Sequence, residues 1–282
     1  MMSLILDGNH AASAIKHKVR EAIAESGTQP RLAVVLVGHD PASKIYVRNK
    51  AKDCEQCGID SVTYVLPEDT SEEKLVELIR SLSNDDSVHG ILVQLPLPKH
   101  INKDHVISAI KPEKDVDGFT KANTMAMLDG KFRFVPCTPG GIIELMRFYK
   151  IPIVGRHCVI VGRSDIVGKP MATIALWNNA TTTICHSHTR NLGGICKSAD
   201  ILISATGRKN LIKPEFIKPN TTIIDVGMNR DKDGKLCGDC NPEAYERSSA
   251  YTPVPGGVGP MTRAMLLLNA VTAAGLKVRL DW

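Results

Sequence analysis

Short apolar runs alternate with longer amphipathic runs along almost the whole chain, and this alternation constrains the fold most strongly. In the first half, strand-like runs cover 31–38, 61–67 and 88–96, while apolar residues at helical spacing cover 42–57 and 71–83. Strands that alternate with helices pair in parallel through right-handed crossovers. The first half is therefore predicted to form a βαβ sheet.

The second half of the chain repeats this plan. Its strand-like runs recur about every 20 residues, as in successive βαβ units. They cover 157–162, 181–186, 200–207 and 221–227. We expect a second parallel sheet from these four runs.

Glycine and proline are dense between the two halves, at "PCTPGG" (136–141) and "IPIVG" (151–155). Such residues interrupt regular structure. The run 141–150 between them has helical spacing and can connect two domains, and 259–275 reads as a strong amphipathic helix at the end of the chain. The boundary between the two halves is therefore predicted here.

With 282 residues, the chain is long enough for two domains. We predict an α/β protein of two lobes. An N-terminal βαβ lobe comprises 1–137 with 264–282, and a Rossmann-like C-terminal lobe comprises 138–263. A cleft is expected between the lobes, because ligands bind at domain interfaces and at the carboxyl ends of parallel strands.

Charge and hydropathy exclude several classes of protein. The net charge of +5 is mild and scattered, and no basic run interleaved with aromatic residues indicates nucleic-acid binding. No uninterrupted apolar stretch approaches the ~18 residues of a membrane span. The first residues lack the long apolar region of a secretory signal, so a cytoplasmic protein without a membrane association is expected.

The eight cysteines include two C-x-x-C pairs, Cys54/Cys57 and Cys237/Cys240. Two such pairs can build a tetrahedral zinc site. They lie 180 residues apart, far beyond the spacing of zinc ribbons, and the first pair falls within a helical pattern. Reduced thiols are therefore favoured over a zinc site, and no metal is predicted.

The stretch "VIVGRSDIVGKPMA" (159–172) reads as a strand, a tight turn and a helix. A G-x-G-x-x-G fingerprint would begin at Gly162, but its second glycine is Ser164 and its third lies one place late, at Gly168. Pro170 suits the first turn of a helix. A helix N-terminus beside free amides can hold a phosphate group, although a plain turn between strand and helix also fits this stretch alone.

The end of the following strand favours NADP over NAD. An NAD site usually places a carboxylate there, about 20 residues after the fingerprint, to bind the ribose 2′-hydroxyl. This chain instead has hydroxyl and cationic groups: His186, Ser187, His188, Thr189 and Arg190. These groups, together with Arg163, suit a 2′-phosphate, although any single one can be part of a solvated strand end.

Two further polar groups occur in the N-terminal lobe. Tyr46 and Lys50 share one face of a predicted helix, because they are four residues apart. They can serve as a stacking platform and a proton-handling amine, or belong to a solvated basic helix. A short-chain dehydrogenase is rejected, because its Y-x-x-x-K motif follows the cofactor fingerprint instead of preceding it. Gln94, at a strand end, can direct its amide into a cleft.

Two loop segments offer ligand contacts. In "PEKDVDGF" (112–119), Asp115 or Asp117 can accept paired N–H donors from a heterocycle such as a pterin, or the two acids shape the turn. In "TPVPGGVGPMT" (252–262), the backbone of Pro255, Gly256 and Gly257 can form a wall against a flat ligand, or the segment is a rigid linker.

These motifs occur together and in order. "YVRNK", "VQLPLP", "PEKDVDGF", "PCTPGG", "VGRSDIVGKP" and "TPVPGGVGPMT" resemble the bifunctional methylenetetrahydrofolate dehydrogenase/methenyltetrahydrofolate cyclohydrolase family, in its form with two activities and no synthetase domain. The resemblance spans essentially the whole chain.

The resemblance implies that one site oxidises 5,10-methylenetetrahydrofolate with NADP and hydrolyses the methenyl product to 10-formyltetrahydrofolate. It makes the N-terminal lobe the catalytic folate-binding domain and the C-terminal lobe the NADP-binding domain. It implies that Lys50 is the central catalytic amine of the hydrolytic step, that Gln94 tunes and positions it, that Tyr46 stacks on the folate and that Asp117 anchors the pterin. The expected cofactor contacts are Gly162, Arg163, Ser164, Gly168, Ser187 and Met228. A homodimer paired through the cofactor domain is also implied.

Two alternatives lie in other classes. One is a different oxidoreductase on a similar two-lobe frame, acting on a shikimate-like or amino-acid substrate. The other is a nucleotide-binding module without catalysis. Both leave "YVRNK", "VQLPLP" and "DVDGF" without an evident use.

Overall fold

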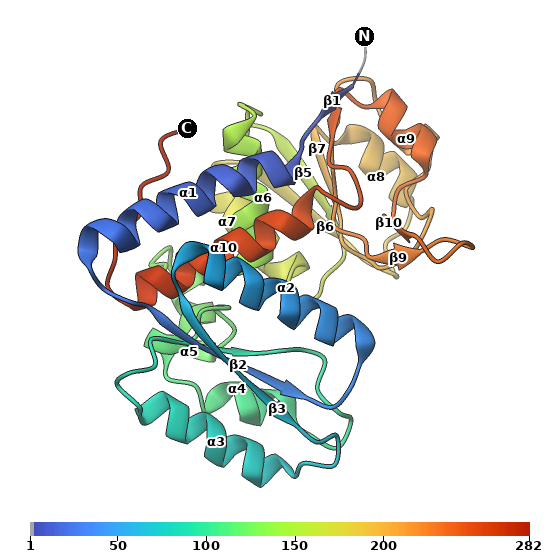
Figure 1. Cartoon of the computed structure of the whole chain (residues 1–282). Helices are drawn as coiled ribbons and strands as arrows, with labels where there is room; N and C mark the ends of the chain where they lie inside the picture. Colours follow the sequence, from blue (N-terminus) through green and yellow to red (C-terminus); the bar gives the residue numbers. More distant parts are fainter. Residues whose placement is uncertain (1–2) are drawn as a thin grey trace. The chain divides into compact units, whose positions relative to one another are not determined.

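The structure, a computed structural model, describes residues 3–282. The chain forms two compact units (Figure 1). The three-strand unit comprises 14–137 and 263–281, and the six-strand unit comprises 3–13, 138–262 and 282. Two helices, α1 (Gly8–Ser26) and α10 (Val258–Ala273), contribute residues to both units.

The three-strand unit is built on a parallel sheet in the order β3-β2-β4. Val35 of β2 lies opposite Tyr64 of β3 and Val93 of β4. The elements of this unit, in chain order, are β2 (Arg31–Val37), α2 (Pro41–Cys57), β3 (Asp60–Leu66), α3 (Glu72–Asn84), β4 (Gly90–Val93), α4 (Lys103–Ser108), a 3₁₀ turn (Pro112–Lys114) and α5 (Lys121–Leu128). The predicted βαβ sheet is confirmed.

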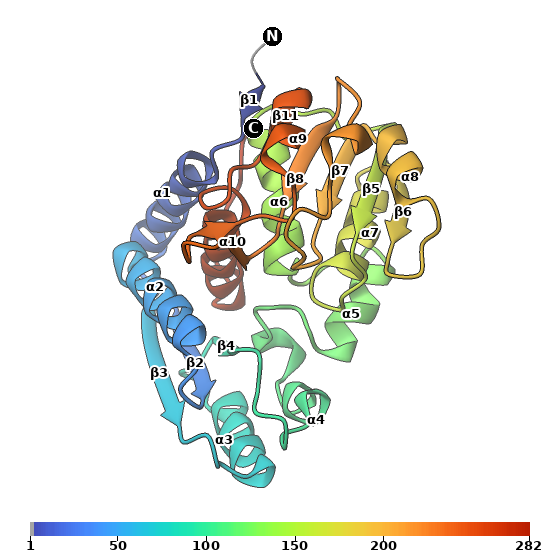
Figure 2. The same cartoon turned by 90° about the vertical axis from the view of Figure 1, so that its right-hand side faces the viewer.

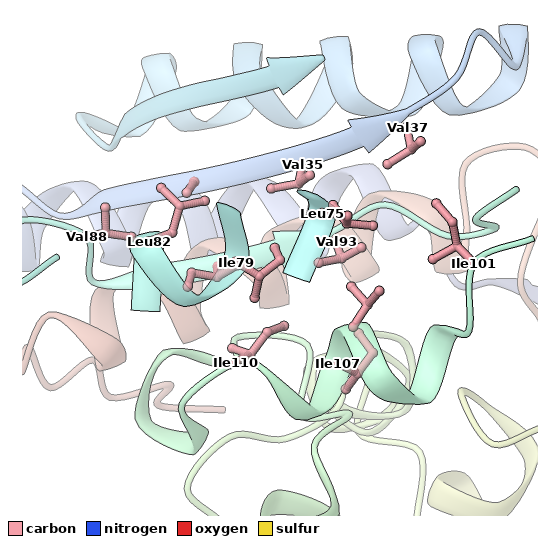
Figure 3. Close-up of a cluster of buried hydrophobic side chains, with 13 residues drawn as sticks. Val35, Val37, Leu75, Ile79, Leu82, Val88, Val93, Ile101, Ile107 and Ile110 are labelled. Carbon is pink, nitrogen blue, oxygen red and sulfur yellow. The ribbon is translucent and has the colours of Figure 1, made fainter. Parts of the chain in front are cut away.

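One face of this sheet packs on α3 and α4, as Figure 3 shows. Alternate residues of a strand point to opposite faces, so Val35 and Val37 enter this cluster together with Leu75 and Ile79 of α3 and Ile107 of α4. Burial of each such side chain stabilises the folded unit by about 1.5–3 kcal/mol. This packing fixes the carboxyl ends of β2 and β4, where polar residues follow.

Helix α2 has clear start and stop residues. The Asp40 carboxylate accepts a hydrogen bond from the Ser43 amide at 2.7 Å, and Pro41 occupies the first turn. At the other end, Gly58 adopts the left-handed conformation with φ 80°, which costs glycine little. These caps hold the helix in which Tyr46 and Lys50 lie.

The six-strand unit has a parallel sheet in the order β1-β11-β8-β7-β5-β6 (Figure 2). Its elements, in chain order, are β1 (Leu4–Ile5), α6 (Cys137–Phe148, whose first residue belongs to the other unit), β5 (His157–Val161), α7 (Gly168–Trp177), β6 (Thr181–Cys185), α8 (Leu192–Ser198), β7 (Ile201–Ser204), a 3₁₀ turn (Pro214–Phe216), β8 (Thr222–Asp225), the hairpin β9 (Asn229–Arg230) and β10 (Leu236–Cys237), α9 (Pro242–Arg247) and β11 (Ala250–Tyr251). The four predicted strands are present, each within the predicted range.

The order of the strands creates a switch point between β5 and β7. The chain moves outward from β5 to the edge strand β6 and then crosses back to β7. In doubly wound sheets, ligands bind beyond the carboxyl ends of the strands at this point. The predicted Rossmann-like fold is confirmed, and its switch point lies beside the loop after β5.

Three local features differ from the sequence prediction. "PCTPGG" does not break the structure, because Cys137–Gly141 form the first turns of α6. The N-terminal residues fold with the six-strand unit, where Leu4 of β1 pairs with Ala250 of β11. Helix α1 (Gly8–Ser26) was not anticipated.

Candidate active site

Lys50 is buried in the three-strand unit, with only 8% of its surface exposed. Its Nζ donates a hydrogen bond to Gln94 Oε1 at 3.1 Å and lies 5.8 Å from the centre of the Tyr46 ring. Because residues 46 and 50 are one helical turn apart, α2 presents both on one face. The predicted trio of Tyr46, Lys50 and Gln94 is brought together. Lys44, Arg48 and Lys52 remain exposed, so the solvated basic face forms without Lys50.

Gln94 is oriented by two hydrogen bonds from its own nitrogen atoms. Its backbone N–H donates to Val35 O at 2.8 Å, which extends the pairing of β2 and β4, and Nε2 donates to Leu95 O at 2.7 Å. With Nε2 engaged, the side-chain oxygen Oε1 is left to face Lys50. Two backbone carbonyls thereby fix the acceptor of the lysine.

The two acids of "PEKDVDGF" have different tasks. Asp115 is 1% exposed, and its Oδ2 accepts hydrogen bonds from Thr120 N at 2.7 Å and Asn123 Nδ2 at 2.9 Å. It therefore shapes the turn before α5. Asp117 is half-buried and within electrostatic reach of Lys50. Of the two candidates, Asp117 is the one that accompanies the lysine.

The pKa of Asp117 is raised above its ordinary value. The main cause is burial of the carboxyl group, which the nearby charge of Lys50 and a hydrogen bond from the Cys137 thiol only partly oppose. The pKa of Cys137 is also raised well above its usual value, again mainly by burial. The thiol is therefore a neutral donor beside Asp117.

Asn269 supports this region from α10 and was not identified from the sequence. Its Nδ2 donates to Val116 O at 2.8 Å and to Val135 O at 2.9 Å, and lies 3.7 Å from Cys137 Sγ. The amide thus ties the segment before Asp117 to the segment before Cys137. The one available sequence indication was an asparagine within the apolar run "MLLLNAV".

A buried ion-pair network flanks the same helix face and was also missed. Asp53 is 6% exposed, and its two oxygens accept from Lys16 Nζ and, at 2.7 Å, from Arg263 Nε. Asp53 follows Tyr46 and Lys50 at positions i+7 and i+3, so its place on the shared face was visible in the spacing. Burial raises the pKa of Tyr46, against the smaller effect of Arg263.

In the six-strand unit, two glycines allow the backbone to approach closely after β5. A Cβ atom on Gly162 would lie 2.4 Å from Ala205 O, and one on Gly168 would lie 2.2 Å from Gly162 O. Gly162 also has a φ of 127°. Gly168, one place late in the motif, therefore provides the close contact of helix and strand that the third fingerprint glycine provides.

Ser164 organises the loop between these glycines. Its Oγ accepts hydrogen bonds from Val167 N at 3.2 Å and Gly168 N at 3.3 Å, at the start of α7. The hydroxyl hydrogen has no acceptor among the described residues, so it can still donate to a phosphate oxygen. The predicted side-chain contact remains open to Ser164, whose Oγ also holds the first amides of α7.

The polar residues after β6 form a tight turn beside this loop. Gly162 N donates to Cys185 O at 2.9 Å, so Arg163 and His186 follow paired positions. Within the turn, His186 N donates to Thr189 Oγ1 at 2.8 Å. Arg163 and Ser187 are exposed. These cationic and hydroxyl groups, with the glycine cradle, fit a dinucleotide that carries a 2′-phosphate.

The remaining predicted contacts also lie in the six-strand unit. Met228 is 56% exposed and follows β8, the neighbour of β7. Pro255, Gly256 and Gly257 form a loop whose Gly256 carbonyl accepts a hydrogen bond from Gly8 N at 2.9 Å. A Cβ on Gly257 would lie 2.6 Å from Thr252 Cβ. The loop is therefore a tightly packed backbone surface.

The cysteine pairs belong to different units, Cys54/Cys57 to α2 and Cys237/Cys240 to the region of β10. Burial raises the pKa of Cys54 to about 12.

Among residues 3–282, no group of three or more histidine, cysteine or acidic side chains is placed to hold a metal ion. No helix in this range has the length and apolarity needed to cross a membrane.

The doubly wound sheet and the glycine-containing loop after β5 are typical of a dinucleotide-binding domain. The buried Lys50, which donates to the side-chain amide oxygen of Gln94, lies in the other unit. Together these features indicate a dinucleotide-dependent enzyme with a separate catalytic unit. Family models identify it further. Residues 6–117 match the catalytic domain of tetrahydrofolate dehydrogenase/cyclohydrolase, and residues 136–278 match its NAD(P)-binding domain. The chain belongs to the tetrahydrofolate dehydrogenase/cyclohydrolase family.

Individual relatives agree over nearly the full length. A bifunctional protein FolD from Ruminiclostridium cellulolyticum is 52% identical over 98% of this chain and 99% of its own length. The crystal structure of the bifunctional enzyme FolD from Campylobacter jejuni has a TM-score of 0.94 at 46% identity and covers 97% of this chain and 99% of that one. A Trypanosoma brucei relative, complexed with NADP cofactor and inhibitor, has a TM-score of 0.92 at 36% identity, with 97% of each chain covered.

These findings confirm the predicted family, the enzyme class with its two activities and the NADP cofactor. They exclude the alternatives of an oxidoreductase acting on another substrate class and of a module without catalysis. The roles assigned to individual residues are not tested by them, and they stay predictions that the contacts above support.

Proposed function

We propose that Lys50 is the amine on which the hydrolytic activity depends, in a folate site that includes Tyr46, Gln94 and Asp117. The substrate is 5,10-methylenetetrahydrofolate, which is oxidised to the methenyl cation, and water then converts this cation to 10-formyltetrahydrofolate. The observation that carries the proposal is the hydrogen bond from the buried Lys50 Nζ to Gln94 Oε1 at 3.1 Å. An amine held in this way is positioned to handle a proton in a site sheltered from bulk water.

The hydrolytic step can be balanced with the residues present. The oxygen of water forms a bond to the methenyl carbon and loses one proton. A ring C–N bond then breaks as the second water proton passes to the departing nitrogen, which leaves the formyl group on the other nitrogen. Lys50 accepts or relays the proton from the attacking water, and Gln94 keeps Nζ at the position where the water adds. The sum is one water consumed and one proton released.

Asp117 and Tyr46 are proposed to hold the folate. The raised pKa of Asp117 keeps its carboxyl protonated to higher pH than an exposed aspartate. When ionised, the carboxylate can accept paired N–H donors from the pterin, which removes the cost of its burial. The Tyr46 ring, near Lys50 Nζ, offers a flat apolar surface for stacking.

NADP, when bound, would supply the hydride acceptor for the oxidation of the methylene carbon. The residues proposed to hold it are Gly162, Arg163, Ser164, Gly168, Ser187 and Met228. Gly162 and Gly168 let the backbone approach the pyrophosphate, Ser164 donates its hydroxyl, and Arg163 with Ser187 binds the 2′-phosphate. The backbone of Pro255, Gly256 and Gly257 is proposed as a wall against the folate. The domain boundaries proposed for these roles are 1–137 with 264–282 for folate and 138–263 for NADP.

A cytoplasmic homodimer is proposed, paired through the cofactor domain. In support, the edge strand β6 exposes 40% of Ile184, and the adjacent α7 exposes 60% of Leu176 and 49% of Trp177. Exposed apolar patches on sheet edges mark interaction surfaces. The variant Ile184→Lys should sediment as a monomer where the unmodified chain sediments as a dimer, and equal masses for both would contradict this interface.

One coupled assay tests the function. Purified protein is given 5,10-methylenetetrahydrofolate with NADP or NAD, and formation of the methenyl absorbance is followed. In a second cuvette, the decay of added methenyltetrahydrofolate is followed without cofactor. We expect NADP-dependent formation and protein-dependent decay, and the absence of both from folded protein would refute the proposal.

A further inference from the structure

Two buried carboxylates, Asp225 and Asp239, lie beside the carboxyl ends of β7 and β8 in the six-strand unit. Asp239 is 0% exposed and Asp225 is 1% exposed. Neither forms an ion pair with a lysine, arginine or histidine within the described residues 3–282. Each is instead surrounded by N–H and O–H donors, and no function discussed so far uses them.

Asp239 connects two separate loops. Its Oδ2 accepts from Ser204 Oγ at 2.9 Å, from Thr206 N at 2.7 Å and from Thr206 Oγ1 at 2.8 Å. Its Oδ1 accepts from Arg208 N at 3.0 Å and from Asn229 Nδ2 at 2.9 Å. One carboxylate thus fixes the loop after β7 and the segment after β8 with five hydrogen bonds, and bonds to an ionised acceptor are the stronger kind.

Both loops adjoin the cofactor residues. The loop after β7 begins at Ala205, whose carbonyl occupies the space that a Cβ on Gly162 would need, at 2.4 Å. The segment after β8 carries Met228 directly before Asn229. A shift of either loop therefore changes the wall against which the dinucleotide lies at the switch point.

The backbone of Gly227 packs directly against the Asp239 carboxylate, and the backbone of Gly238 packs directly against the Asp225 carboxylate. A Cβ on Gly227 would lie 2.4 Å from Asp239 Oδ1, and one on Gly238 would lie 2.2 Å from Asp225 Oδ2. Asp225 holds the other side of the arrangement, because it accepts from Asp239 N at 2.9 Å, Cys240 N at 2.8 Å and Tyr245 Oη at 2.7 Å. The position of Asp239 is therefore itself determined by its neighbours.

We propose that Asp239 is the positioning residue of the cofactor site: it holds the Thr206–Arg208 turn and the Met228 segment in the conformation that binds NADP. The inference rests on the proposed NADP site. Asp239 does not touch the cofactor in this proposal, and its effect passes through Ala205 and Met228. Its loss lowers the population of the binding-competent loops, which reduces the apparent affinity by the same factor.

The principal test is Asp239→Asn in the full-length protein. An amide places an N–H where the carboxylate accepted two or three donors, so the loops lose their common anchor. If about a tenth of the variant molecules keep the two loops in the conformation that binds NADP, the Kd for NADP rises about tenfold. This Kd is measured by titration calorimetry, without folate and independently of turnover. The cyclohydrolase rate, which needs no NADP and whose proposed catalytic residues Tyr46, Lys50, Gln94 and Asp117 lie in the other unit, should stay unchanged.

A matched pair of milder variants covers the case in which Asp239→Asn does not fold. Ser204→Ala removes one hydroxyl donor from Asp239, and Ser204 is 0% exposed, so it cannot touch a bound cofactor. Tyr245→Phe removes one hydroxyl donor from Asp225 instead. Loss of one such bond corresponds to a factor of about 3–10 in an equilibrium constant, so Ser204→Ala should raise the Kd for NADP roughly threefold. Tyr245→Phe should leave this Kd nearly unchanged, because Asp225 keeps the Asp239 N and Cys240 N donors that hold Asp239 in place.

The outcomes separate this inference from the proposed function. If the unmodified protein does not bind NADP, the proposed function fails first. If it binds NADP but folded Asp239→Asn and Ser204→Ala bind it equally well, the positioning role is overturned. Equal weakening by Ser204→Ala and Tyr245→Phe also overturns it, because a general loss of packing would then explain the effect.

Discussion

The two units hold their functional residues by different means. In the three-strand unit, the proposed chemistry belongs to side chains, and Lys50 is held by Gln94 beside an ion-pair network around Asp53. In the six-strand unit, the proposed cofactor site is mainly backbone, with glycines that allow close approach and with Asp239 held by N–H and O–H donors. A proton-handling amine needs one fixed position, whereas a long polyanionic cofactor needs a shaped surface.

The two units also differ in how each balances a buried carboxylate, Asp53 in the three-strand unit and Asp239 in the six-strand unit. Asp53 is balanced by two cations, Lys16 and Arg263. Asp239 is balanced by the dipoles of donors from two segments of the chain, 204–208 and the segment at Asn229. Charge pairing ties helices together and responds to the loss of either partner, while a set of backbone donors defines loop geometry. Four predictions test this contrast, from the largest expected effect to the smallest.

The largest effect is expected for Lys50→Met. Removal of the amine should lower the cyclohydrolase rate by about 10²–10⁴, the usual contribution of a positioned proton-transfer group. NADP binding in the other unit should be unchanged. The matched control is Lys52→Met, because Lys52 is exposed on the same helix. The rate of methenyltetrahydrofolate decay is measured for the unmodified protein and for both variants. An unchanged rate in Lys50→Met would refute the role of the lysine.

The next effect concerns the backbone surface of the cofactor site. In Gly162→Ala, the new Cβ meets Ala205 O at 2.4 Å in a residue with a φ of 127°. Steric overlap and backbone strain together should cost about 3 kcal/mol of unfolding free energy and weaken NADP binding. Gly155→Ala, at φ 72° with no atom within 4 Å, should cost only about 1 kcal/mol. Urea unfolding and NADP titration of both variants test this; equal losses would argue against the close approach.

A smaller effect is expected when the charge pairing of the three-strand unit is broken. Asp53→Asn leaves Lys16 and Arg263 without their anion, and these side chains are 17% and 25% exposed. Breaking a fully buried pair costs 3–5 kcal/mol, and partial exposure reduces this to about 2 kcal/mol. Urea unfolding measures the loss. Asp60→Asn, which breaks the more exposed pair with Arg31, should cost much less, and a loss as large as that of Asp53→Asn would contradict a special role for Asp53.

The smallest effect is a change of stability with pH from Asp117. Because its folded pKa is raised, the folded protein holds this proton at pH values where the unfolded chain, with a pKa of about 3.9, has released it. Stability therefore falls as pH rises towards the folded pKa and remains lower above it. Asp117→Asn cannot ionise, so it should exceed the unmodified protein in stability at pH 8 by more than at pH 5, while losing activity. Thermal unfolding of both proteins at both pH values checks the sign; a stability difference, variant minus unmodified protein, that is smaller at pH 8 than at pH 5 would show the opposite linkage.

Much of the fold was predictable because it depends on local pattern. Apolar runs such as 31–38 and 157–162 specify buried strands, and the amphipathic spacing in 42–57 specifies α2, whose face then carries Tyr46 and Lys50 together. Gln94 was predictable as a strand-end residue because prolines follow it. "PCTPGG" was misread, because proline and glycine are tolerated in the first turn of a helix that other contacts stabilise.

The supporting residues were harder to predict, since their partners are distant in sequence. Asp53 meets Arg263, which is 210 positions away, and Asn269 meets Val116 and Val135. Each looks like an ordinary polar residue in a helix. Asp239 follows a glycine near a hairpin, a setting in which aspartate usually only shapes a turn.

The sequence by itself determined the parallel α/β architecture, the motif-bearing residues and the family, because these depend on periodicity and on short ordered motifs. Tertiary structure alone decided how Gln94 is turned toward Lys50, that Asp115 is instead spent on the turn before α5, and that Gly168 takes the place of the third fingerprint glycine. It also decided the partners of Asp53 and Asp239. Burial and hydrogen bonding between distant segments set these outcomes, and neither quantity exists until the chain has folded.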